Sequence, residues 1–154
     1  MKLFLDSSFF FPFIRTKVKG VSKQDVSDLF KNDQFEVLRS DLVTFELSAK
    51  GTKYVNDGLL KIEDVIDGLN VIVYNASIHV IPIHHSEIQI LAAVLRKDHS
   101  DFIDCLTLAS AIFHSTTFLT LDEELAEKSR EVWSQLIKES NETFTVVLWK
   151  DFIN

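Results

Sequence analysis

The sequence predicts an α/β fold, a three-layer α/β/α sandwich around a central, mostly parallel sheet of about five strands. Short apolar runs alternate along the chain with longer amphipathic stretches, a pattern typical of parallel sheets covered by helices on both faces. The 154 residues are 46% hydrophobic with only 4 Gly and 2 Pro, and they show no repeat, linker or composition break. We therefore expect one ordered domain over residues 1–154.

The predicted strands are short runs of apolar, β-branched or aromatic residues, too brief to form helices. The first run, KLFL, ends directly before Asp6, and a later run, FLTL, ends directly before Asp122. Both aspartates therefore follow the carboxyl end of a predicted strand. In chain order, the expected strands cover residues 2–5, 34–38, 78–83, 118–121 and 144–149.

The predicted helices have apolar residues three and four apart, and several begin at a capping residue. Ser22 caps the first, while Ser40 and Asp41 are candidate caps for the second, which contains Glu46. The stretch FIDCLTLASAIF is apolar nearly all round, which predicts a buried central helix with Asp104 in its first turn. In chain order, the expected helices cover residues 22–31, 42–49, 61–75, 84–97, 101–114 and 123–139.

Charge and cysteine content limit the class of protein. With 16 Lys and Arg against 23 Asp and Glu, the net charge is −7, which argues against tight, nonspecific binding to polyanions. The single Cys105 cannot form an intrachain disulfide, and no stretch reaches the roughly 18 apolar residues of a membrane span. Asp6 and Pro12 interrupt the apolar start of the chain, so we expect a mature cytoplasmic protein without membrane attachment.

Four carboxylates lie among apolar residues rather than on solvated helix faces: Asp6, Glu46, Asp104 and Asp122. Open parallel sheets form their ligand crevice beyond the strand ends, and buried carboxylates repel one another unless a cation compensates them. Oxygen ligands favour Mg²⁺ or Mn²⁺, and such ions activate water to attack phosphorus. Any one acid alone is equally well explained as a cap or turn residue. His79, His99 and His114 have no partner at the spacing of zinc ligands, and the adjacent His84 and His85 are better explained as capping or surface residues.

Four segments in order, KLFLDSS, DLVTFELSAKG, DCLTLASAIFHS and FLTLDEEL, resemble the motifs of PIN domains, including the VapC-type toxin ribonucleases. The resemblance spans nearly the whole chain. It implies that the four acids cluster at one Mg²⁺ or Mn²⁺ site that is catalytic. Asp6 and Asp104 would be the most direct metal ligands, and Glu46 and Asp122 would complete the charge and position a water or second ion.

The resemblance also suggests residues that support the acids. The small hydroxyl residues that accompany the acids in this family fall on Ser8 and Thr120. Asp101 shares a helix face with Asp104 and is a candidate supplementary ligand. Glu124 is a further acid whose direction the sequence leaves open.

The implied function is a divalent-metal-dependent endoribonuclease acting on single-stranded or structured RNA, with an antitoxin protein as a possible partner. An alternative is a catalytically inactive PIN-like domain that binds RNA or a protein. A receiver-type phospho-acceptor domain also gathers aspartates around Mg²⁺, but it fits less well because Asp104 lies inside a helix motif.

Two further segments bear on partners. Five large residues in a row, Phe9 to Phe13, cannot all face one interior, so we expect some of them to form a surface patch that supports a homodimer. The densest basic stretch, at Arg15, Lys17 and Lys19, is either the path of an RNA backbone or a solvated loop.

Overall fold

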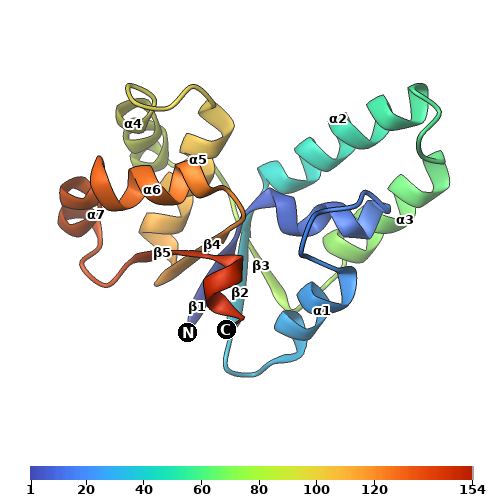
Figure 1. The fold of residues 1–154 in the computed structure, drawn as a ribbon, viewed down its shortest axis with the longest axis horizontal. Coiled ribbons are helices and arrows are strands. Elements are labelled where there is room, and N and C mark those ends of the chain that lie inside the picture. Colours follow the sequence, from blue (N-terminus) through green and yellow to red (C-terminus); the bar gives the residue numbers. More distant parts are fainter. Residues whose placement is uncertain (154) are drawn as a thin grey trace.

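The computed structural model describes residues 1–153 and contains one sheet of five strands in the order β3-β2-β1-β4-β5 (Figure 1). All four pairs of neighbouring strands are parallel. The α/β prediction is therefore confirmed. The strands are β1 (Lys2–Leu5), β2 (Glu36–Ser40), β3 (Ile78–Ile81), β4 (Thr117–Thr120) and β5 (Thr145–Leu148).

The strand order places a switch point at the centre of the sheet. The chain starts at β1, moves outward through β2 to β3, and then crosses back to β4, which pairs with the other edge of β1. Helical connections diverge at such a point, which opens a crevice at the carboxyl ends of the two central strands. The loops that follow β1 and β4 are therefore the expected location of a functional site.

Helices cover both faces of the sheet. One core cluster packs against Leu3 and Leu5 of β1, and a second packs against Phe4 of β1 and Phe118 of β4. In Figure 1, α1–α3 lie to one side of the sheet and α4–α7 to the other. Within residues 1–153, no helix is both long and apolar enough to cross a bilayer. The helices are η1 (Ser7–Ile14, a 3₁₀ helix), α1 (Lys23–Lys31), α2 (Leu42–Asn56), α3 (Ile62–Val73), α4 (Ser86–Leu95), α5 (Phe102–His114), α6 (Glu123–Glu131), α7 (Ser134–Ser140) and α8 (Trp149–Phe152).

The helix expected over 123–139 is two helices, α6 and α7, with a break at Trp133. The Trp133 backbone N–H donates to the Lys128 carbonyl, five residues earlier, in place of the usual four. The indole is buried, and its Nε1 donates to Asp98 Oδ2 at 3.2 Å. Burial of this side chain against α5 and the loop before it accounts for the break.

The run of phenylalanines does not form the expected surface patch, and that prediction is wrong. The run forms η1, and Phe9, Phe10, Phe11 and Phe13 are all buried. A 3₁₀ helix points its side chains in three directions, but η1 contacts α1, α2 and α3, so all of these directions are interior. Gly68 of α3 lies so close to the Phe13 backbone that a side chain there would collide with it.

The basic stretch follows η1 in an exposed loop. Arg15, Lys17 and Lys19 are all exposed, and Arg15 Nε lies 2.9 Å from Asp64 Oδ1 of α3. One of the three cations is therefore already paired within the chain.

Candidate active site

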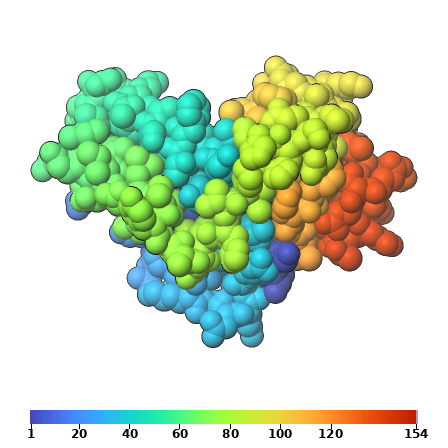
Figure 2. Space-filling view, turned by 180° about the vertical axis from the view of Figure 1, so that it is seen from behind, coloured from blue at the N-terminus to red at the C-terminus, as the bar shows by residue number. Residues whose placement is uncertain are grey.

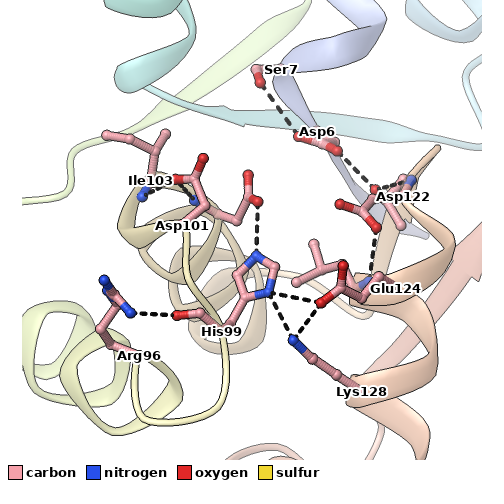
Figure 3. Close-up of polar contacts among 12 residues, drawn as sticks. Asp6, Ser7, Arg96, His99, Asp101, Ile103, Asp122, Glu124 and Lys128 are labelled. Atoms are coloured by element: carbon pink, nitrogen blue, oxygen red, sulfur yellow. Dashed lines mark hydrogen bonds and ion pairs between the residues drawn. The ribbon is translucent and has the colours of Figure 1, made fainter.

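The four acids come from the central strand ends and from two helices beside them. Asp6 directly follows β1 and Asp122 caps α6 just beyond β4, while Glu46 lies in α2 and Asp104 in the first turn of α5. Because β1 and β4 are neighbouring parallel strands, the two strand-end aspartates share one edge of the sheet. The sequence predicted this placement, and Figure 3 shows Asp6 and Asp122 near one another.

Thr120 connects the two strand-end aspartates. Its Oγ1 donates to Asp6 Oδ2 at 2.8 Å and accepts from the Asp122 backbone N–H at 3.0 Å. Thr120 therefore contacts both strand-end aspartates, while its supporting role in a site stays a prediction. Ser8 does not: its Oγ is buried with no partner among the described residues, whereas the neighbouring Ser7 Oγ donates to Asp6 Oδ1 at 3.4 Å.

Helix capping explains part of the arrangement. Asp122 Oδ1 accepts from the Leu125 N–H at 2.9 Å and so caps α6. Asp101 Oδ1 accepts from the Ile103 N–H at 2.8 Å and caps α5. The exposed Asp101 carboxylate is thus held by the first turn of α5, and its role as a supplementary ligand stays a prediction.

Glu46 carries the clearest sign of an unmet interaction. Its Oε1 is buried and accepts no hydrogen bond from any residue in 1–153. The pKa of Glu46 is raised to about 7, mainly by burial and in smaller part by the charges of Asp6 and Asp104, while Ser7 and Lys50 oppose the shift. A buried acceptor without a donor is costly, and a cation would satisfy it.

Burial and mutual repulsion also shift the other acids. The pKa of Asp6 is raised to about 6, mainly by burial and in smaller part by the charges of Asp104 and Asp122, while hydrogen bonds from Thr120 and Ser7 oppose the shift. The pKa of Asp104 is raised mainly by burial and then by the charges of neighbouring aspartates, while His99 lowers it. The carboxylates are therefore close enough to oppose one another's ionisation.

The residues present fit a hydrated divalent cation better than a closed metal cage. In the described part of the chain, no three His, Cys, Asp or Glu side chains are already arranged to hold an ion. Mg²⁺ keeps several waters and needs only one or two carboxylates. The oxygen-only acid set, the repulsion within it and the unsatisfied Oε1 of Glu46 suit such an ion.

One contact of a candidate site acid was not predicted from the sequence. His99, in the loop between α4 and α5, is buried, and its Nε2 lies 2.9 Å from Asp104 Oδ2. The two residues are five apart and separated by a loop, so helical spacing gives no signal for the contact. Glu124 lies at the rim of the site, exposed and paired with Lys128 at 2.5 Å.

The raised pKa of Asp6 predicts a pH-dependent stability in metal-free buffer. Between the ordinary pKa of 3.8 and the folded value of about 6, the folded protein binds more protons than the unfolded chain, so stability falls as pH rises. Asp6→Asn removes this loss but keeps an acceptor for Thr120. We expect the variant to gain about 1–3 kcal/mol on the wild type between about pH 4 and 7.

Urea unfolding in the presence of a chelator measures this gain. The exposed Asp33→Asn variant is a matched control and should follow the wild type at every pH. If Asp6→Asn and the wild type lose stability in parallel as pH rises, the carboxyl of Asp6 does not have the raised pKa.

Comparison with known proteins agrees with the fold. The chain is similar to a solved structure described as VapBC2 from Rickettsia felis bound to a DNA fragment from their promoter, at 15% identity and a TM-score of 0.58, covering 97% of this chain and 99% of that one. This likeness supports the fold. No curated protein matches. The family model for the PIN domain matches residues 3–131, and the chain belongs to the PIN domain family.

Proposed function

We propose that this protein is a divalent-metal-dependent endoribonuclease that hydrolyses phosphodiester bonds in single-stranded or structured RNA. The observation that carries the proposal is the gathering of carboxylates at the switch point, where burial and the charges of neighbouring acids raise the pKa values of Asp6, Glu46 and Asp104. Perturbed acids in such a crevice are typical of functional sites. Membership of the PIN family supports a nuclease.

The chain's own residues hold the acids in place before any substrate binds. Asp6 and Asp104 would be the most direct ligands of Mg²⁺ or Mn²⁺, with Glu46 and Asp122 completing the charge. Thr120 holds Asp6 and the first turn of α6 holds Asp122, so little reorganisation is needed. When bound, the ion supplies an activated water and neutralises phosphate oxygens.

The acidic composition is compatible with this role. A net charge of −7 excludes tight, salt-driven binding to nucleic acid, but part of that charge belongs to acids whose proposed purpose is to hold cations. The metal, rather than a lysine-rich surface, would then recruit the phosphate.

Cleavage of single-stranded RNA in the presence of Mn²⁺ tests the proposal. We expect Asp6→Asn and Asp104→Asn each to lower the cleavage rate by at least about 100-fold, because each removes charge that the metal requires. The control is Asp33→Asn, because Asp33 is exposed and lies before the start of β2, whereas the acids lie beyond the ends of the strands. This variant should cleave RNA as the wild type does. Undiminished cleavage in both site variants would refute the assignment.

The alternative, a catalytically inactive PIN-like domain that binds RNA or a protein, has one observation in its favour. As noted, no three potential ligands within residues 1–153 already form an ion site. This alternative predicts RNA binding that a chelator does not affect, with no cleavage in Mg²⁺ or Mn²⁺. The same assay therefore separates the two functions.

We further propose an antitoxin protein as partner, because the structural neighbour is a VapBC toxin–antitoxin complex. Exposed apolar side chains flank the acids: Phe45, next to Glu46, is 66% exposed, and Phe102, near Asp104, is 40% exposed. Figure 2 shows a notch between the lobe of α2 and α3 and the lobe of α4. An apolar segment of a partner that docked over Phe45 and Phe102 would cover these side chains.

Light scattering, with and without the protein encoded beside this chain, tests both kinds of assembly. We expect the chain alone to be a homodimer at micromolar concentration, although η1 does not supply the surface, and we expect the neighbouring protein to join it and suppress RNA cleavage. A mass of 17.6 kDa for the chain alone would exclude the homodimer. Unchanged mass and cleavage after addition of the neighbour would exclude it as an antitoxin.

A further inference from the structure

His99 is placed to hold the carboxylate of Asp104. Its side chain is only 5% exposed, and its Nε2 lies 2.9 Å from Asp104 Oδ2 (Figure 3). Within residues 1–153, this is the one hydrogen bond that the Asp104 carboxylate makes. The imidazole of His99 is therefore the hydrogen-bonding group that orients the Asp104 carboxylate.

The groups around the ring determine which nitrogen carries the proton. Nδ1 of His99 lies 3.4 Å from the Lys128 ammonium, which is itself held by Glu124 Oε1 at 2.5 Å. Glu124 Oε1 lies 4.0 Å from Nδ1, beyond hydrogen-bond distance. An ammonium can only donate, so Nδ1 accepts from Lys128. The proton of the neutral ring is then on Nε2, from which it is donated to Asp104.

The ring is also prevented from turning away. Arg96 Nη1 donates to the His99 carbonyl at 2.9 Å and so holds its backbone. The Trp133 indole packs edge-on against the imidazole, with ring centroids 6.2 Å apart and planes at 86°. The indole is held in turn by Asp98. Contacts with Asp104, Arg96 and Trp133 therefore restrain the orientation of His99. A residue that positions a metal ligand needs such restraint.

We propose that His99 is a positioning residue: its Nε2–H fixes the orientation of Asp104 for the divalent cation, with Lys128 selecting the required tautomer. The inference rests on the proposed function, which assigns Asp104 to the metal. Hydrogen bonds of this kind orient the ligands of metal sites, and their loss costs about 10–100-fold in metal affinity. His99 touches neither the metal nor the substrate, so its effect passes entirely through Asp104.

Three substitutions separate positioning from simple packing. His99→Leu fills the space without a donor, His99→Gln places an amide N–H near the position of Nε2, and His99→Asn places it near Nδ1, short of Asp104. We expect Mn²⁺ binding, measured by electron paramagnetic resonance of the free ion, to weaken about 10–100-fold in the Leu and Asn variants. The Gln variant should recover most of the wild-type affinity.

The outcomes distinguish this inference from the proposed function. Wild-type affinity in His99→Leu, or equal affinities in the Gln and Asn variants, would overturn the positioning role alone, provided that Asp104→Asn abolishes binding. Wild-type affinity in Asp104→Asn would overturn the metal site and the positioning role together.

A metal-free measurement keeps the inference testable if a variant fails to fold. Long-range ¹H–¹⁵N correlation spectra of the wild-type protein at about pH 8 report which imidazole nitrogen is protonated. We expect His99 to carry its proton on Nε2. A neutral ring that carries its proton on Nδ1 would overturn the inference, since Nε2 would then have no proton to donate to Asp104.

Discussion

The structure depends on one electrostatic constraint: like charges are brought together where two central parallel strands end. The parallel neighbours β1 and β4 end at the same edge of the sheet. Asp6 follows β1, and Asp122 lies just beyond β4. Glu46 and Asp104 approach from helices on either side. Burial raises the pKa of three of these acids and their mutual charge adds to the shift, so a cation would relieve a cost that the fold itself creates.

The groups that hold the acids also hold the fold. Asp122 caps α6 by accepting from the Leu125 N–H. Thr120 Oγ1 donates to the Asp6 carboxylate and accepts from the Asp122 N–H. A carboxylate that caps a helix is fixed by backbone geometry and still has capacity for a further ligand. The same aspartate can therefore cap a helix and bind an ion. For this reason the sequence pattern alone does not distinguish a capping acid from a site acid.

Features that depend on local sequence patterns could be predicted. Features that depend on contacts between residues distant in the sequence could not. Short apolar runs marked the strands, and acids in apolar surroundings marked the site, with their roles implied by the family resemblance. The burial of Phe10 and its neighbours depends on α1, α2 and α3 enclosing η1, and the contact of His99 with Asp104 depends on the path of a loop. The buried indole of Trp133 interrupts a helix that its amphipathic pattern would continue. None of these three has a periodic signal.

The central claim is that the four carboxylates hold a divalent cation. A crystal structure of the protein soaked with Mn²⁺ tests it most directly, because anomalous scattering locates the ion independently of any activity. The account predicts an anomalous peak at the switch point, in direct contact with oxygens of Asp6 and Asp104 and with Glu46 and Asp122 turned toward it. Mn²⁺ bound only elsewhere on the surface, with the four carboxylates apart and without an ion between them, would contradict it.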